Sequence, residues 1–293
     1  MDAFHQGNAE HNGIDALLPA EMAIKAEEIG VKKATLNLLS LFTLSVMAGA
    51  FIAFGAAFST TTVAGASGVL PFGVTRLLAG LVFSLGLILV IVGGAELFTG
   101  NNLIVMAWAS RRISTAQVLR NWVVVFAGNF IGAWALAVLM FLSGQQRLGN
   151  GAVGAAALAI AQAKTNLSFT EAVTRGVLCN VLVCLAVWLS YSGRSLTDKL
   201  LAVVPPITAF VACGFEHSIA NMYFIPAALF IKAAAPLPFW TEIGKTANDF
   251  AALTWERFLF ANLLPVTLGN LIGGALLVGL VYWFVYLKGR HHE

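Results

Sequence analysis

Two long apolar stretches of this chain are each interrupted by the same polar pattern, G-x-E-x4-N. The first reads Gly94-Ala95-Glu96-Leu97-Phe98-Thr99-Gly100-Asn101, and the second reads Gly214-Phe215-Glu216-His217-Ser218-Ile219-Ala220-Asn221. A carboxylate deep in apolar sequence is costly and usually functional. Unwound backbone at membrane depth survives only where protein buries it or where it lines a watery cavity. We therefore expect two interrupted helices whose breaks meet near the membrane midplane and border a path.

The composition of this chain suits a lipid environment. Of its 293 residues, 59% are hydrophobic and only 11% are charged, and the mean hydropathy is +0.83. Soluble domains carry about 25% charged residues, so this chain has too few charges to cover a surface that faces water. The net charge of +3 comes without a basic run, which gives no sign of a nucleic-acid partner.

Six stretches are apolar enough to cross a bilayer, which takes about 20 residues. They cover residues 36–58, 72–108, 118–142, 171–191, 200–231 and 258–287. The second and fifth are too long for one crossing, and these two carry the polar pattern. The sequence therefore predicts an all-α, multi-pass membrane protein with an amino-terminal segment (1–35), a six-span domain (36–287) and a short tail (288–293).

Basic residues predict the orientation. They precede the first span and follow the second, fourth and sixth, as Lys25, Lys32, Lys33, Arg111, Arg112, Arg120, Arg194, Lys199, Lys288 and Arg290. The loop after the first span has no charge, and the loop after the fifth offsets its lysines with carboxylates. Because basic loops stay in the cytoplasm, both termini are expected there.

The amino-terminal segment lacks the basic start and short apolar core of a secretory signal. Residues 20–33 have the pattern of an amphipathic helix, with Met22, Ala26 and Ile29 on one face. We expect this helix to lie on the membrane or over a neighbouring subunit.

The third and sixth spans repeat each other as well. Both read N-x6-G-N-x-I-G, from Asn121 to Gly132 and from Asn262 to Gly273. The two matches divide the span region into halves of three spans, about 36–145 and 170–287, and an odd number of spans inverts the second half. Inverted repeats with interrupted helices are a plan of transporters and channels. Small residues four apart let helices approach, which predicts close packing at Gly128, Gly132, Gly269 and Gly273.

The breaks hold the candidate polar residues. We expect Glu96 and Glu216, with Asn101 and Asn221, to support the breaks by capping free backbone N–H groups. His217 is the one histidine away from the tails, which hold His5, His11, His291 and His292. A buried histidine is often only a packed core residue, but an imidazole at a break can donate to an anion and carry a proton near neutral pH.

Cys179, Cys184 and Cys213 lie in apolar segments without metal-ligand spacing. We expect packing residues there, and neither a metal nor a cofactor. One inner histidine cannot form a bis-histidine haem site, which disfavours a membrane enzyme.

These motifs resemble the formate/nitrite transporter family over nearly the whole chain. The two break segments carry the resemblance. It is strongest to the formate channels of the family, through Leu18-Pro19-Ala20, Val187-Trp188-Leu189-Ser190-Tyr191-Ser192-Gly193-Arg194-Ser195-Leu196 and Leu264-Pro265-Val266-Thr267-Leu268-Gly269-Asn270. The resemblance implies an aquaporin-like protomer of six helices, assembled as a homopentamer with one pore per subunit in a bacterial inner membrane.

By the same match, Thr99, His217 and Asn270 line the substrate path. Two constrictions would be formed by Phe83, Leu87, Leu97, Phe98 and Phe210, and Lys164 in the outer loop would attract anions. The sequence from Glu96 to Gly100 also occurs in the nitrite branch of the family, so this loop does not exclude nitrite as the substrate.

We therefore predict passage of formate in both directions, either as the bare anion or with a proton from His217. A bare charge in apolar surroundings is costly, so the pore must supply positive potential from half-helix N-termini or neutralise the anion. Nitrite, hydrosulfide and acetate stay open, because they are also small anions of weak acids. A water or glycerol channel is disfavoured, because the Asn-Pro-Ala pair of aquaporins is absent from both breaks.

Overall fold

The computed structural model describes residues 16–289, and within that range the chain forms helices and turns without a strand. The tail histidines His5, His11, His291 and His292, like Arg290, lie outside the described residues. Five helices in this range are long and apolar enough to cross a membrane: α2 (Leu38–Val63), α3 (Phe72–Gly93), α5 (Thr115–Leu142), α7 (Phe169–Ser192) and the continuous helix Arg257–Tyr286. The last comprises η4 (Arg257–Leu263), α11 (Leu264–Leu271), η5 (Ile272–Leu280) and α12 (Val281–Tyr286).

The remaining helices are shorter. They are α1 (Pro19–Thr35), η1 (Gly100–Ile104), α4 (Val105–Ala109), η2 (Gln145–Arg147), α6 (Ala152–Thr165), α8 (Leu196–Ala212), α9 (Ser218–Ala234), α10 (Leu237–Glu242) and η3 (Ala247–Phe250). The expectation of a plain outer loop around Lys164 was wrong, because Lys164 lies in α6. This alanine-rich helix has 14 residues and is too short to be recognised as a crossing.

Both long apolar stretches change direction at a glycine. Gly94 follows α3 with a φ of 80°, and Gly214 lies just beyond α8 with a φ of 74°. This left-handed conformation suits glycine, which has no Cβ to clash. The backbone then leaves the helix in the same way in both halves. The Glu96 N–H donates to the Leu44 carbonyl at 3.2 Å, and the Glu216 N–H donates to the Arg175 carbonyl at 3.2 Å.

The predicted glycine contacts are confirmed. Gly132 of α5 lies against the carbonyl of Val46 in α2, and Gly273 lies against the carbonyl of Val177 in α7. In both places a Cβ would collide with backbone, which cannot move aside as a side chain can. Gly269 likewise lies against the Val173 carbonyl of α7, and Gly128 lies against the Ser45 Cβ of α2.

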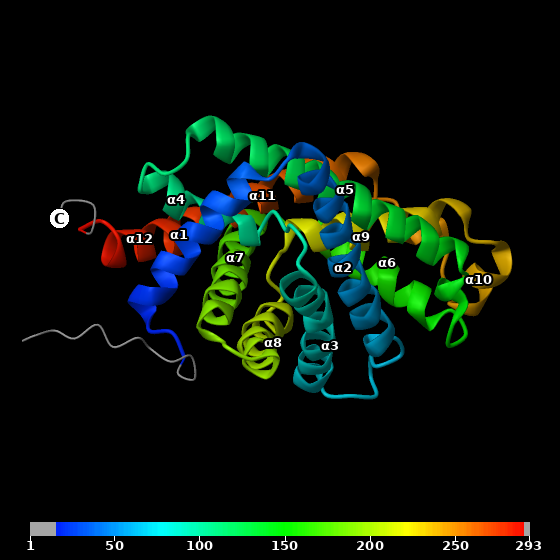
Figure 1. Cartoon of the computed structure of the whole chain (residues 1–293). Coiled ribbons are helices and arrows are strands. Elements are labelled where there is room, and N and C mark those ends of the chain that lie inside the picture. Colours follow the sequence, from blue (N-terminus) through cyan, green and yellow to red (C-terminus); the bar gives the residue numbers. More distant parts are fainter. Residues whose placement is uncertain (1–15, 290–293) are drawn as a thin grey trace, which may run out of the picture.

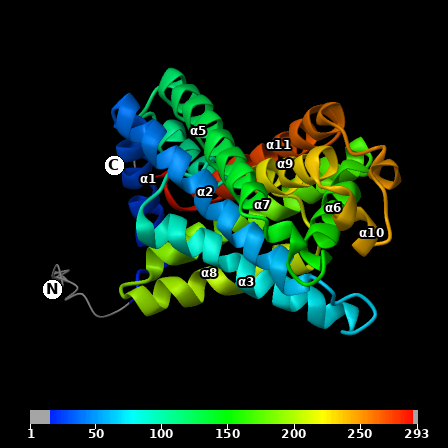
Figure 2. The same ribbon diagram turned by 90° about the vertical axis from the view of Figure 1, so that its right-hand side faces the viewer.

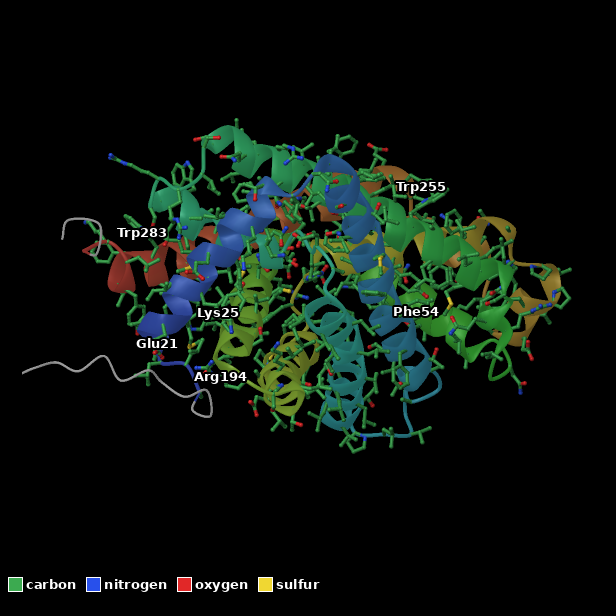
Figure 3. All side chains as sticks on the ribbon, in the orientation of Figure 1. Glu21, Lys25, Phe54, Arg194, Trp255 and Trp283 are labelled. Atoms are coloured by element: carbon green, nitrogen blue, oxygen red, sulfur yellow. The ribbon has the colours of Figure 1, made fainter. Side chains whose placement is uncertain are left out.

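The amphipathic helix α1 packs against α7 of its own chain. Met22 and Ala26 are buried against Trp188 of α7, and Lys25 Nζ donates to the Tyr191 carbonyl at 2.8 Å. Figure 3 shows Lys25 near Arg194, beyond the end of α7. Partial burial, and after it the positive charges of Lys199 and Arg194, lower the pKa of Lys25.

The helices are arranged around the two breaks. Figure 1 shows α3 and α8 side by side, and Figure 2 places α1 at one end of the molecule and α6 with α10 at the other. We call these ends the α1 side and the α6 side. Large apolar side chains remain on the outer surface, such as Phe54 of α2 (labelled in Figure 3), which is 45% exposed. Such a surface suits contact with lipid.

Two of the three cysteines are packing residues as expected. Cys179 and Cys184 are buried in α7, and Cys184 Sγ lies 3.3 Å from the Thr99 carbonyl. Cys213 is exposed, which corrects its expected burial. It is the C-cap residue that follows α8, where the chain leaves the packed helix for the break.

Candidate functional site

A half-buried lysine meets a buried glutamate and a buried asparagine at the first break. Lys33 Nζ lies 2.7 Å from Glu96 Oε1, and Asn101 Nδ2 donates to Glu96 Oε2 at 2.7 Å. The same lysine reaches Asn101 Oδ1 at 3.0 Å. Asn121 of α5 completes the cluster by accepting from Asn101 and donating to the Lys33 carbonyl.

The second break carries the same cluster. Lys164 Nζ lies 2.9 Å from Glu216 Oε1, and Asn221 Nδ2 donates to Glu216 Oε2 at 2.7 Å. Asn262 accepts from Asn221 at 2.7 Å and donates to the Lys164 carbonyl at 3.0 Å. The helices α1 and α6, which carry the two lysines, therefore hold equivalent places in the two halves.

The carboxylates do not cap backbone N–H groups, so the predicted capping role of Glu96 and Glu216 was wrong. Glu96 is 6% exposed and Glu216 is 3% exposed, and their oxygens accept from lysine and asparagine side chains. A buried charge needs such a partner, because a carboxylate left unpaired in a low dielectric is strongly destabilising. Lys33 was interpreted only as an orientation signal. Its equivalence to Lys164 emerges from the structure: each lysine stands 11 residues before the residue whose carbonyl binds the glutamate N–H, Leu44 or Arg175.

A second pair of asparagines holds the unwound segments. Asn129 Nδ2 donates to the Ser45 and Glu96 carbonyls, and its Oδ1 accepts from the Phe98 N–H. Asn270 is used in the same way, on the Gly176 and Glu216 carbonyls and the Ser218 N–H. Both amides bind backbone through Nδ2 and through Oδ1, which explains the repeated asparagine of the G-N pair.

The two breaks meet at Thr99 and His217. Thr99 Oγ1 lies 2.9 Å from His217 Nε2, and both residues are buried. His217 is also the N-cap of α9, since its Nδ1 accepts from the Ala220 N–H at 3.0 Å. A backbone N–H can only donate, so Nδ1 carries no proton here. The neutral ring therefore carries its proton on Nε2 and donates it to Thr99 Oγ1. The Thr99 hydroxyl hydrogen is left to donate elsewhere.

One cavity opens toward each side of this pair. The α6-side cavity is about 370 Å³ and is lined by His217, Phe83, Phe210, Lys164 and Glu216, among others. The α1-side cavity is about 230 Å³, and its lining residues include Leu87, Leu97, Lys33, Glu96 and Asn101. Four of the five predicted constriction residues therefore sort into an aromatic pair on the α6 side and a leucine pair on the α1 side.

The aromatic pair is in direct contact. The ring centroids of Phe83 and Phe210 are 5.5 Å apart in an edge-to-face arrangement, and the Phe210 ring stacks on His217 at 5.8 Å. Phe98 does not join them. Its ring packs against Phe126 and Trp122 of α5, away from the α1-side cavity that Leu97 lines.

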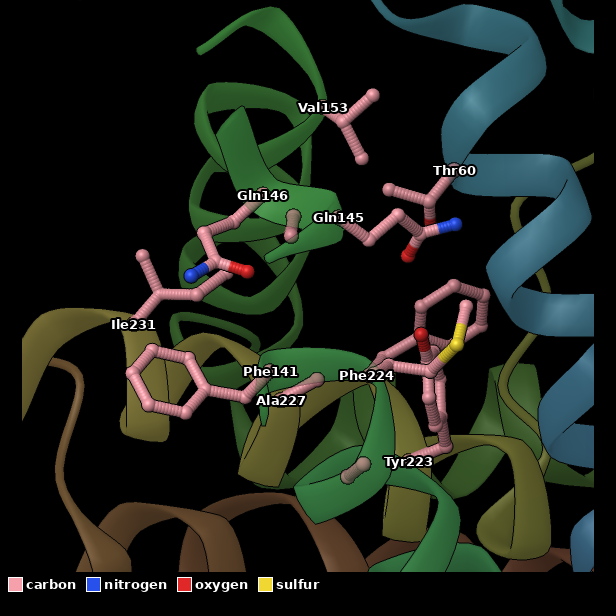
Figure 4. Close-up of a pocket in the computed structure, with 12 residues that line it drawn as sticks. Thr60, Phe141, Gln145, Gln146, Val153, Tyr223, Phe224, Ala227 and Ile231 are labelled. Carbon is pink, nitrogen blue, oxygen red and sulfur yellow. The ribbon is translucent and has the colours of Figure 1, made fainter. Parts of the chain in front are cut away.

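A smaller cavity of about 20 Å³ lies between α2, α5, α6 and α9. Figure 4 shows Gln146, Phe141 and Ile231 on one of its sides, opposite Thr60 and Phe224. Its lining contains none of the residues predicted for the substrate path. It has room for about one water molecule, and we do not place the path there.

Comparisons with known proteins agree with this arrangement. A family model described as formate/nitrite transporter matches residues 20–284. The chain is 50% identical to the formate channel FocA of Escherichia coli strain K12 over 282 residues, which are 96% of this chain and 99% of that protein. It is 44% identical over 264 residues to formate channel FocA of Haemophilus influenzae, covering 90% of this chain and 93% of the relative.

Among solved structures, the chain is similar to one described as a pentameric formate channel with formate bound. The TM-score is 0.82 and the sequence identity is 45%, with 86% of this chain and 98% of that chain covered.

Proposed function

The chain belongs to the formate/nitrite transporter family, and on that basis we propose that it passes formate across the membrane in both directions. The observation that carries the proposal is the buried Thr99–His217 pair. His217 lines the α6-side cavity, and Leu97 and Gly100, which flank Thr99 in the chain, line the α1-side cavity. The formate channels among its relatives and the formate-bound structure support this substrate over others.

We propose the following path from the α6 side. An anion enters the cavity at Lys164, crosses the Phe83–Phe210 pair and reaches Thr99 and His217. It leaves between Leu87 and Leu97 into the α1-side cavity. The aromatic and leucine pairs would strip water from the anion, and the Thr99 hydroxyl would replace part of that hydration. Asn270 would act on this path by holding the His217 segment in place.

The assembly follows from the same relationship. We propose six crossings, with α8 and α9 together forming the fifth, in two inverted halves of three crossings each. We also propose a homopentamer with one pore per protomer, in the inner membrane of a bacterium, with the α1 side facing the cytoplasm. Support comes from the similarity to a pentameric formate channel and from the basic residues near α1.

Passive passage and proton-coupled passage make different demands on the hydrogen bonds of His217. A neutral ring cannot give up its Nε2 proton without becoming an unfavourable anion, so coupling requires the ring to gain a second proton. The site for that proton is Nδ1, which would have to release the Ala220 N–H. We propose that proton-coupled uptake in acid proceeds through this release, and that passage of the bare anion near neutral pH does not need it.

The test is anion flux into proteoliposomes that contain the purified protein. Formate, nitrite and hydrosulfide are compared at equal concentration, with pH set on both sides. Formate should move fastest. Equal or faster nitrite or hydrosulfide flux would overturn the substrate assignment while leaving the family and the path in place.

A further inference from the structure

The two cavities occupy equivalent places in the repeat but differ in charge. Charged side chains in the α1-side lining are Lys33 and Glu96, which pair with each other. The α6-side lining holds the equivalent pair, Lys164 and Glu216, together with two arginines. The formal charge of the lining is therefore +2 on the α6 side and zero on the α1 side.

The extra charges are Arg76 and Arg175, and leucines stand at the equivalent places of the other half. The Arg175 carbonyl accepts from the Glu216 N–H as the Leu44 carbonyl accepts from the Glu96 N–H. Arg76 stands 18 residues before the glycine that follows its own helix, Gly94, and Leu196 stands 18 residues before Gly214. The repeat alone does not require these arginines.

Arg76 is fixed at the broken end of α8. Its Nε donates to the Ala212 carbonyl at 3.1 Å, and its Nη2 donates to the Val211 carbonyl. These are among the last carbonyls of the helix, where the helix dipole is negative. Without a positively charged partner, these carbonyls would repel an anion. The guanidinium binds them and adds a positive charge. Within residues 16–289 no side-chain donor is seen on the equivalent carbonyls of Ile91 and Val92, at the end of α3.

Arg76 also stands where an anion would enter. It lines the α6-side cavity and also a wider neighbouring cavity of about 570 Å³, which includes Ala66 and Gly68 of the loop between α2 and α3. Arg175 is a weaker candidate because Glu171 lies 3.8 Å away and both side chains are well exposed. Exposed pairs of this kind are screened by water.

We propose that Arg76, assisted by Arg175, makes the α6-side cavity an anion-concentrating entrance that the α1 side lacks. The inference rests on the proposed passage of formate and assigns Arg76 as a positioning residue for that function. A cleft lined by one sign of charge raises the local concentration of its counter-ion by about 10-fold to 1000-fold, and the α6-side lining, with three basic residues and Glu216, approaches that case. Loss of one such charge should therefore cost about threefold or more in apparent affinity for the anion.

A passive pore limits how the asymmetry can appear. At zero voltage, the ratio of maximal rate to half-saturating concentration must be equal from both sides, or the pore would drive net flux between equal concentrations. An entrance that concentrates anions on one side therefore lowers the half-saturating formate concentration on that side, together with the maximal rate from it. The asymmetry lies in these two constants, not in their ratio.

The experiment measures initial formate flux against formate concentration, from each side, in vesicles of opposite orientation held at zero voltage. Three variants accompany the parent protein. Arg76→Gln keeps an amide donor for the α8 carbonyls but removes the charge, and Arg76→Lys keeps the charge. Lys245→Gln is the control, because it removes an exposed charge near α10 that does not line the cavity. Gel filtration of each purified variant checks that assembly is unchanged.

We expect the parent to have the lower half-saturating concentration from the α6 side. Arg76→Gln should raise it about threefold or more, whereas Arg76→Lys and Lys245→Gln should stay near the parent. The difference should shrink as ionic strength rises from about 0.1 M to 1 M, because the Debye length falls from about 10 Å to 3 Å. Unchanged constants in Arg76→Gln, or a change that resists salt, would overturn the inference and leave formate passage intact. A parent that carries no formate would overturn both.

Discussion

His217 combines two roles that substitution can separate, because one depends on Nδ1 as an acceptor and the other on the ring as a base. Nδ1 caps α9 by accepting from the Ala220 N–H at 3.0 Å, and Ala220 is 2% exposed. His217→Ala leaves that N–H buried without an acceptor. The loss of an N-cap costs about 1 kcal/mol, within a range of about 0.5–2 kcal/mol. His217→Asn supplies a side-chain oxygen that is among the best N-cap acceptors, but it has no group that titrates near neutral pH.

The two variants therefore give a matched pair. Both lose the hydrogen bond to Thr99, so the difference between them reports the cap alone. Thermal unfolding of the detergent-solubilised protein should show His217→Ala less stable than His217→Asn by about 1 kcal/mol. Formate uptake should rise in acid for the parent and lose that rise in both variants, while His217→Asn keeps measurable flux at neutral pH.

Two results would refute this reasoning. If His217→Asn keeps the rise of uptake in acid, the proton does not travel through the imidazole, and the proton-coupled mode needs another carrier. If His217→Ala and His217→Asn unfold at the same temperature, the Nδ1 contact contributes no stability and the assigned tautomer loses its support.

Three further outcomes follow from the structure. Lys164→Met should destabilise the protein by about 3–5 kcal/mol because it leaves Glu216 buried and unpaired, and the double variant with Glu216→Gln should recover part of that loss in a thermal unfolding cycle. Gly132→Ala should cost at least about 1–3 kcal/mol, since its Cβ meets backbone of α2, and a parent-like melting temperature would contradict that contact. Hydrogen bonds from the backbone and hydroxyl of Thr246 lower the pKa of Asp249, so its contribution to stability is present above the unfolded pKa and is lost as pH falls through the folded pKa. The melting difference between parent and Asp249→Asn should therefore vanish as pH is taken well below about 3.9, and a difference that persists in acid would refute the assignment.

Much of the site was predictable because its signals are local. The glycines at both breaks need a left-handed conformation, and the break carboxylates are rare charges in apolar sequence, so each stands out within a few residues. Thr99 and His217 were expected in facing breaks, and the structure joins them across 118 residues. In the repeated G-N pair, the glycines were predicted to pack and Asn270 to line the substrate path. Only the structure shows that Asn129 and Asn270 bind the unwound backbone.

Residues that act across long separations were missed or misplaced. Lys33 binds Glu96 across 63 residues, and in the sequence it is one more basic residue before a span. Arg76 binds the end of α8 across 136 residues. Phe98 was expected at a constriction and instead packs on α5, because the direction of a side chain in an unwound segment has no fixed period.

The sequence by itself determined that the chain lies in lipid, that its two halves repeat, and where the helices break. These features depend on hydropathy and on glycine conformations, which are set by residues close together in the chain. The tertiary structure decided which charges pair, which cavity each ring faces and how the two entrances differ. Those depend on distances between segments far apart in the chain. A buried charge or a helix end takes whichever partner the fold brings within hydrogen-bonding distance, and no spacing along the chain specifies that partner.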